Sequence, residues 1–178
     1  MLEKPMNDRH SGERSRPNLG ASGPLAYDSA MLSWDYVDSR MRDAQNYWIA
    51  SAGEDGRPHA VPVWGAWLED VFYFVGTGRK VRNLRANPRA VVHLESGDDV
   101  VLIEGSFKEI GQPSRDLLRQ VDEEFIRKYK TYRPSEHLND RSKSNFPPEG
   151  LFAVMPQLVI AWSGMASDAT RWKFPARQ

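Results

Sequence analysis

The sequence contains no cysteine, and this absence excludes several kinds of site. Disulfides, cysteine-ligated zinc, iron–sulfur clusters and thiol nucleophiles all require a cysteine side chain. The lack of cysteine is also compatible with a reducing compartment. His10, His93 and His137 show no metal-ligand spacing with each other or with acidic residues, so the sequence predicts no metal site.

The chain also lacks a net charge and a long apolar run. Its 24 basic residues balance its 24 acidic residues over 178 positions. Proteins that coat nucleic acid need a basic face, and a membrane span needs roughly 20 apolar residues. The first residues have no apolar core of the kind that a secretory signal carries. We therefore expect a soluble, cytoplasmic protein without nucleic-acid or membrane partners, and one domain, since the length is too short for two ordinary ones.

Residues 1–28 differ in composition from the rest of the chain. They mix charged residues, glycine, proline and serine and hold almost nothing apolar to bury. This composition is typical of disordered segments. We expect a disordered N-terminal arm over 1–28 and a folded domain over 29–178.

The apolar pattern predicts mixed helices and strands. Trp34, Val37 and Met41 recur at helical spacing, and a second amphipathic stripe follows Pro113-Ser114. Strand-like segments are 47–52, 59–68, 71–76, 90–96 and 100–110, followed by a hairpin or pair of strands within 151–164 and a tail over 169–174. Many short antiparallel strands with two or three helices indicate a small β-barrel of the α+β class.

The segment 59–68 is apolar almost throughout, as is typical of a strand that is buried on both faces. Pro62 lies within it and cannot donate a ladder hydrogen bond. The strand is therefore expected at a sheet edge or at a bulge.

The stretch GTGRKVRNLRANPRA, residues 76–90, holds five cations and no acid. The cations are Arg79, Lys80, Arg82, Arg85 and Arg89. After the Thr77-Gly78 turn, residues 79–86 predict a short helix that stops before Asn87-Pro88, with Val81 and Leu84 toward the core. The cations would then project from the first turns of a helix whose free backbone N–H groups can bind phosphate.

Three anions could meet these cations: the protein's own carboxylates, nucleic acid, or a phosphate group. The neutral composition and the lack of flanking stacking aromatics disfavour nucleic acid. The glycines match neither the G-x-G-x-x-G pattern nor the P-loop, so neither a dinucleotide fold nor an NTPase follows. The spacing alone leaves the surface ion pairs and the phosphate both open.

An ordered set of motifs resembles the pyridoxamine 5′-phosphate oxidase-like superfamily, and more narrowly its flavin- and deazaflavin-dependent oxidoreductases. The motifs are YWIASAGEDGRPHAVPVW, VFYFVGTGRKVRNLRANPRAVVHLE, VVLIEG, a helix ending RKY, and ATRWKF, and together they cover about residues 33–174. The resemblance implies a six-stranded antiparallel split β-barrel with flanking helices. It also implies a homodimer that holds FMN or coenzyme F-420 in clefts between the subunits.

The resemblance further implies which residues hold the cofactor. The segment from Thr77 to Asn83 would bind its phosphate, the strand 59–64 would run beside its rings, and the C-terminal segment would approach the cleft, often from the partner subunit. The residues expected to bind cofactor are His59, Val61, Pro62, Val63, Trp64, Thr77, Gly78, Arg79, Lys80, Asn83, Arg171 and Trp172.

Structural alternatives stay open for several of these residues. Trp64 or Trp67 could pack in the core, and His59 could be an exposed residue at a strand start. The segment with Arg171 and Trp172 could be an edge strand that is buried by its aromatic side chains.

The function implied is an oxidoreductase that transfers a hydride between the cofactor and a small conjugated substrate. The vitamin B6 oxidase proper carries an arginine and a lysine where Val61 and Ala66 stand here, so we expect a different activity from pyridoxamine phosphate oxidation. The sequence indicates no catalytic residue. The alternative is a non-catalytic flavin-binding or cofactor-carrier module.

Overall fold

The computed structural model describes residues 12–20, 29–138, 150–164 and 166–175. The helices in these ranges are α1 (Trp34–Asp43), α2 (Arg79–Ala86), α3 (Arg115–Tyr129) and a short 3₁₀ helix η1 (Pro134–Glu136). The strands are β1 (Glu13–Ser15), β2 (Tyr47–Ala52), β3 (Pro58–Val63), β4 (Gly65–Leu68), β5 (Val71–Gly76), β6 (Arg89–His93), β7 (Val100–Ile110), β8 (Gly150–Trp162) and β9 (Thr170–Lys173).

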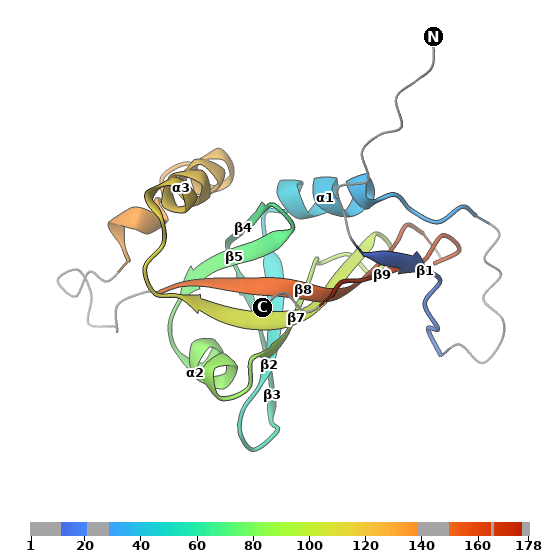
Figure 1. Cartoon of the computed structure of the whole chain (residues 1–178), viewed down its shortest axis with the longest axis horizontal. Helices are drawn as coiled ribbons and strands as arrows, with labels where there is room; N and C mark the ends of the chain where they lie inside the picture. The colour runs from blue at the N-terminus through green and yellow to red at the C-terminus, as the bar shows by residue number, and fades with distance from the viewer. Residues whose placement is uncertain (1–11, 21–28, 139–149, 165, 176–178) are drawn as a thin grey trace, which may run out of the picture.

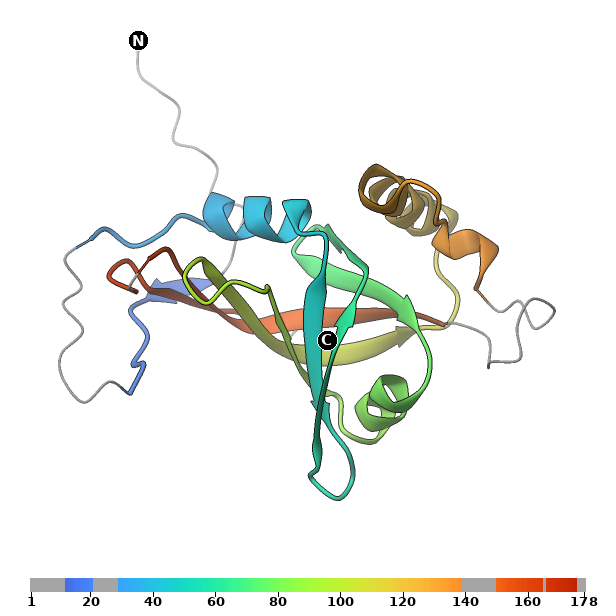
Figure 2. The ribbon, with the colours of Figure 1, turned by 180° about the vertical axis from the view of Figure 1, so that it is seen from behind.

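All nine strands of the described residues belong to one antiparallel sheet in the order β1-β9-β8-β7-β6-β2-β3, and β5 joins β4 to it by pairing with β8. Among the described residues the end strands β1 and β3 do not pair with each other, so the barrel is split and not closed. Figures 1 and 2 show α1 and α3 on one side of the sheet and α2 on the opposite side. The predicted α+β split barrel is confirmed, and its described residues form nine strands where six were expected.

The segment 59–68 forms two strands and not one, because the chain leaves β3 at Val63 and enters β4 at Gly65. The prediction that it is buried on both faces is wrong for β3. There Pro58, Ala60 and Pro62 are exposed and the intervening residues are partly or fully buried. The edge position that Pro62 predicted is confirmed, since β3 is the last strand of the order and pairs with β2.

The predicted pair of strands within 151–164 is one continuous strand, β8. Its register against β7 shifts at Glu104 and Gly105, where Gly105 is opposite Pro156 and Glu104 is opposite Leu158. A bulge is one of the few places in a sheet that accepts a proline. The strand therefore continues through Pro156, which the sequence pattern alone marks as a break.

The core is formed by the inner faces of the barrel strands together with one face of each helix. Trp34, Val37 and Met41 of α1 are buried, as their spacing predicted, and so are Val81 and Leu84 of α2. A second, smaller cluster lies under α3 and consists of Ala66, Val121, Phe125 and Leu151. Burial of these side chains holds each helix against the sheet.

Three residues of the predicted N-terminal arm form a strand of the sheet. Glu13–Ser15 pairs with β9, and Arg16 donates hydrogen bonds to the carbonyl groups of Ser167 (3.3 Å) and Ala169 (3.0 Å). Without β1, strand β9 would be the edge of the sheet and would offer unpaired backbone groups to an extended segment, which apolar composition does not reveal. Residues 1–11 and 21–28 lie outside the described residues, and the boundary at 29 stays a prediction.

The close approach of β7 and β8 at the bulge gives a test of the fold. A Cβ atom at Gly105 would lie 2.4 Å from the carbonyl oxygen of Met155 and 2.8 Å from Cγ1 of Val154. We expect Gly105→Ala to lower the free energy of unfolding by about 2 kcal/mol, because backbone must move to admit the methyl group. Gly97→Ala is the control, since a Cβ there meets nothing within 4 Å. Urea denaturation measures both, and equal stabilities would contradict the tight packing of the bulge.

Candidate functional site

The predicted phosphate site lies where β5 ends and α2 begins (Figure 1). Thr77 and Gly78 connect the two elements, and Gly78 is the N-cap of the helix with φ of 80°. This left-handed conformation strains any residue except glycine. The first backbone N–H groups of any helix have no acceptor within the helix. In α2 they also have no side-chain cap from the N-cap residue, because Gly78 has no side chain.

Lys80 and Asn83 lie on the same side of α2 and reach the ends of two strands, β5 and β2. The Lys80 Nζ atom donates to the carbonyl oxygen of Thr77 at 3.2 Å and lies over Gly76, where a Cβ atom would be 2.8 Å from Nζ. One turn later, the Asn83 Nδ2 atom donates to the Ser51 hydroxyl at 3.3 Å. The structure therefore brings the predicted residues from Thr77 to Asn83 together with the end of β2.

Among the four arginines of the stretch 76–90, Arg85 forms an ion pair and the other three do not, within the described residues. Arg85 donates two hydrogen bonds to Glu109, at 3.0 Å and 2.7 Å, which raise the pKa of Arg85 and lower the pKa of Glu109. In the part of the chain that the structure describes, Arg79, Arg82 and Arg89 form no ion pair and are exposed. The surface ion-pair alternative thus holds for Arg85, which lies in the last turn of the helix.

The β3 residues that were predicted to line the cofactor rings divide between the two faces of the strand. His59, Val61 and Val63 lie on the inner face, where Val61 packs against the main core and Val63 is buried. Pro62 lies on the exposed face. His59 is opposite Ser51 in the β2–β3 register, which places it on the same face as the contact to Asn83. His59 therefore lies opposite the β2 residue that Asn83 of α2 contacts.

Trp64 lies between β3 and β4 and is not a core residue. It is 48 % exposed, and no other large apolar side chain of the described ranges is exposed. Its ring stacks on Tyr129 of α3 with a centroid distance of 4.5 Å, and the ring of Tyr132 lies edge-on to it at 5.9 Å. Trp67, by contrast, is 1 % exposed, so the core alternative holds for Trp67 alone.

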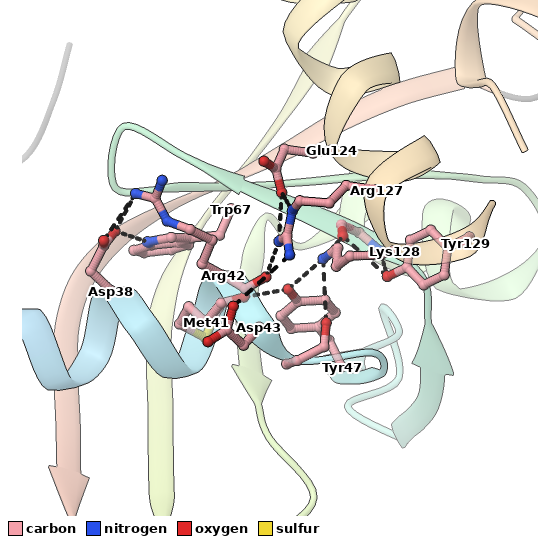
Figure 3. A network of polar contacts seen from close by, with 12 residues as sticks. Asp38, Met41, Arg42, Asp43, Tyr47, Trp67, Glu124, Arg127, Lys128 and Tyr129 are labelled. Carbon is pink, nitrogen blue, oxygen red and sulfur yellow. Dashed lines mark hydrogen bonds and ion pairs between the residues drawn. The ribbon is translucent and has the colours of Figure 1, made fainter.

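A buried lysine lies next to this junction (Figure 3). Lys128 of α3 is 5 % exposed, and its Nζ atom donates to the Tyr47 hydroxyl at 2.7 Å, to the Ala44 carbonyl at 3.3 Å and to the Gly65 carbonyl. The ammonium group also lies 4.6 Å from the Tyr47 ring centroid. All three of its donors have acceptors, so it joins α1, β2 and β4 to α3.

Burial shifts the pKa values of this cluster. Desolvation lowers the pKa of Lys128 from its ordinary 10.5 to about 8, although the carboxylates of Glu124 and Asp43 partly oppose it. Burial also raises the pKa of Tyr129 to about 12 and raises the pKa of Tyr47. Near neutral pH the lysine is therefore charged, and both phenols keep their protons for hydrogen bonding.

Arg171 and Trp172 lie far from the start of α2 within one chain. Gly76 pairs with Gly150 at the start of β8, while Arg171 pairs with Ile160 near its end. At the rise of a β-strand this separation is about 30 Å. Trp172 is 3 % exposed and packs edge-on against Trp34 in the core, so its side chain faces no open surface. Arg171 donates to the Ser15 hydroxyl of β1.

An open groove of about 580 Å³ lies on the sheet beside the candidate site. Its lining comes from β2, β6, β7, β8 and the turn after α2: Ala50, Ser51, Ala52, Asn87, Arg89, Ala90, Val91, Glu104, Gly105 and Gln157. The volume is in the range of small-molecule sites. Ser51 belongs both to this groove and to the contact with Asn83, so the groove adjoins the candidate phosphate site.

Sequence reasoning did not include Ser51, Lys128 or Tyr129 among the site residues. Lys128 occupies a position of the apolar stripe of α3, three residues after Phe125 and seven after Val121, and both of those are buried. A lysine on such a stripe is a detectable signal of a buried charge. Within the described ranges no group of three or more potential ligands could hold a metal ion, and no helix is long and apolar enough to span a membrane.

Known proteins resemble this chain in sequence over one family match and in fold over several solved structures. Residues 35–163 match the family described as Pyridoxamine 5′-phosphate oxidase. No curated protein matches the chain in sequence.

Several solved structures share the fold. An FAD-binding protein from Mesorhizobium loti superposes with a TM-score of 0.54 at 19 % identity, covering 81 % of this chain and 96 % of that protein. The heme storage protein HutZ from Vibrio cholerae has a TM-score of 0.54 at 14 % identity, with 71 % and 90 % covered. A structure named F420 reductase has a TM-score of 0.51 at 20 % identity, with 68 % and 94 % covered. At these identities the likeness shows the fold alone.

The lowered pKa of Lys128 predicts how stability depends on pH. Below pH 8 both the folded and the unfolded chain bind this proton, and the folded state carries the cost of a buried charge. Between about pH 8 and 10.5 the unfolded chain keeps a proton that the folded chain has lost, so the free energy of unfolding rises with pH. Relative to Lys128→Met, the wild type should gain up to about 1.4 kcal/mol per pH unit.

Urea denaturation of both proteins between about pH 7 and about pH 9.5 measures this gain, below the range where exposed tyrosines ionise. Lys128→Met is the matched reference because it keeps the volume of the side chain and removes the titrating group. A difference between the two proteins that stays constant with pH would contradict the lowered pKa.

Proposed function

The chain belongs to the pyridoxamine 5′-phosphate oxidase family, and from this we propose that it is an oxidoreductase that binds FMN or coenzyme F-420. The observation that carries the proposal is the junction of β5 and α2. There an uncapped helix start, the hydroxyl of Thr77, the ammonium group of Lys80 and the amide of Asn83 come from one short segment, Thr77 to Asn83, that runs from the end of β5 into α2. The family supplies the class of ligand, and the junction supplies the donors for its phosphate.

The chemistry of the junction suits a phosphate group. Backbone N–H groups at a helix start donate to anions, and a lysine adds a charge-assisted hydrogen bond. The left-handed Gly78 lets a ligand approach the backbone, since no side chain projects there and a Cβ would meet nothing within 4 Å. Arg79 lies exposed at the first helical position, where it adds a second charge.

The ring system is proposed to lie along β3, from His59 to Trp64. As the last strand of the sheet, β3 has one edge that pairs with no strand of the described residues, which leaves backbone groups for the polar atoms of a ring. Val61 and Val63 support the strand from the core side, and Pro62 stiffens it. The chain would thus fix the position of the rings mainly through its backbone.

When bound, such a cofactor supplies hydride transfer to or from a small, planar, conjugated substrate. The chain's own residues bind the phosphate, orient the rings and limit access of water. Val61 and Ala66 are apolar and stand where the vitamin B6 oxidase proper carries two cations, so the substrate is proposed to differ from pyridoxamine phosphate.

A homodimer completes this proposal. Arg171 is about 30 Å along β8 from the start of α2, so its predicted role requires the C-terminal segment of a second copy. The other expected partner is the small-molecule substrate, and the cytoplasm is the proposed location. Trp172 would contribute by holding β9 in the core, given its burial.

A non-catalytic carrier is the second candidate, and the likeness to a heme storage protein favours it. A carrier would bind and release its cofactor unchanged. An enzyme would reduce the bound cofactor or an added acceptor with saturable kinetics. Steady-state assays of the cofactor-loaded protein distinguish the two.

The phosphate site is tested by titrating cofactor-stripped protein with FMN and, separately, with F-420, following ligand fluorescence. We expect Lys80→Ala to raise the dissociation constant of the preferred cofactor by about tenfold, because one charge-assisted hydrogen bond to the phosphate is lost. Arg85→Ala is the matched control on the same helix, because Arg85 is paired with Glu109. It should change the dissociation constant by less than about twofold.

Riboflavin, which lacks the phosphate, sharpens this test. If Lys80 binds the phosphate, Lys80→Ala leaves riboflavin affinity unchanged while it weakens FMN. Equal losses for FMN and riboflavin, or equal effects of Lys80→Ala and Arg85→Ala, would contradict the site. If the wild type binds neither FMN nor F-420, the proposed function fails.

A further inference from the structure

Side chains of the last turn of α3 bind the backbone of the junction between β3 and β4. The amide of Gly65 donates to the Tyr129 hydroxyl at 3.0 Å, and this hydroxyl lies 3.2 Å from the Gly65 carbonyl oxygen. Lys128 donates to the same carbonyl. Two consecutive residues of one helix thus bind both polar backbone groups of Gly65. From the other side the ring of Phe72 packs so closely that a Cβ at Gly65 would lie 2.3 Å from it.

At this junction Lys128 donates hydrogen bonds that an apolar residue of the same size could not form. In the ranges that the structure describes, no carboxylate lies within ion-pair distance of its ammonium group. Burying a charge without such a partner costs stability. What the lysine provides in return is a simultaneous link to the carbonyl groups of Ala44 and Gly65 and to the Tyr47 hydroxyl. Its geometric role is therefore to set the position of the junction.

Trp64, the residue before Gly65, is the side chain that this arrangement fixes. One face of its indole stacks on the Tyr129 ring with an interplanar angle of 9°, and Tyr132 lies at its edge. Trp64 nevertheless stays 48 % exposed, which leaves the opposite face for another ring to cover. Exposed aromatic side chains usually change rotamer freely. The orientation of Trp64 is restricted by the hydrogen bonds on the backbone of Gly65 and by the stack on the Tyr129 ring.

We propose that Lys128 and Tyr129 are positioning residues that hold Trp64 as a fixed platform for a planar conjugated ring. The inference rests on the proposed function, because Trp64 ends the strand along which the cofactor rings are placed. A pre-organised aromatic surface binds a flat ring with less loss of conformational entropy than a mobile one. The ring can belong to the cofactor or to the substrate.

The first readout is iodide quenching of tryptophan fluorescence in the cofactor-free protein. The difference between each protein and its Trp64→Phe counterpart isolates the signal of Trp64. Lys128→Met removes the ammonium group, and Tyr129→Phe keeps the stacked ring while it removes the hydroxyl. Both should raise the quenching constant of Trp64 by about twofold as the junction loosens. Arg119→Gln is the control, since Arg119 pairs with Asp116 and Glu123 on the exposed face of α3.

The second readout identifies the ring. Dissociation constants for FMN and F-420 are measured for the same variants. The KM for menadione, a planar quinone acceptor, is measured with the chemically reduced cofactor as the electron donor. An increase of about fivefold in the cofactor dissociation constant indicates the cofactor ring, and an increase in KM alone indicates the substrate ring. Trp64→Leu should reproduce whichever change occurs, while Arg119→Gln should produce neither.

A purely structural role of Lys128 and Tyr129 gives a different result. The melting temperatures would fall, while the quenching of Trp64, the dissociation constants and the KM stayed at their wild-type values, and the proposal would be overturned. If the wild type binds neither cofactor, the proposed function has failed on its own titration. In that case the quenching still decides the positioning role, because unchanged quenching in Lys128→Met and Tyr129→Phe rejects it and increased quenching retains it.

Discussion

The structure depends on the pairing of β8 with three other strands. Its first half pairs with β5, its second half pairs with β9, and β7 pairs along its whole length. The bulge at Gly105 and Pro156 lets one strand serve all three partners by bending between them. This pairing also places the start of α2 at one end of the barrel and Arg171 at the other, so one chain cannot bring the two together. The homodimer proposed above rests on this separation within the sheet and not on any single contact.

Much of this arrangement was predictable from local sequence. The burial of Val37 and Met41 and the helix from Arg79 to Ala86 follow from apolar spacing and from the Gly78 and Pro88 boundaries. The features that were missed depend on partners distant in the chain. Pro156 reads as a strand break until the bulge against β7 is known, and β1 exists because β9 presents an open edge.

In the candidate site too, some residues follow from local sequence and others depend on contacts distant in the chain. The segment from Thr77 to Asn83 was predictable because its donors are close in sequence. Ser51 was not, since its hydroxyl reaches the site only through the β2–α2 contact. Lys128 was missed because hydropathy assigns a lysine to the surface, whereas here three acceptors from three separate elements surround it. Sequence patterns indicate whether a residue type is usually buried or exposed. Whether a buried charged group has hydrogen-bond acceptors depends on contacts between elements that are distant in the chain.

The prolines of β3 limit how a second molecule can approach. Pro58, Ala60 and Pro62 share one orientation on the last strand, and prolines fit an edge where the missing N–H would have faced solvent. Of these three positions, only Ala60 keeps a donor. The N–H groups of a neighbouring strand could pair with the carbonyls of β3, but the neighbour's own carbonyls would find only one donor, so sheet extension across this edge, including fibrous self-association, is disfavoured. We therefore expect any assembly on this side to form face to face, through side chains.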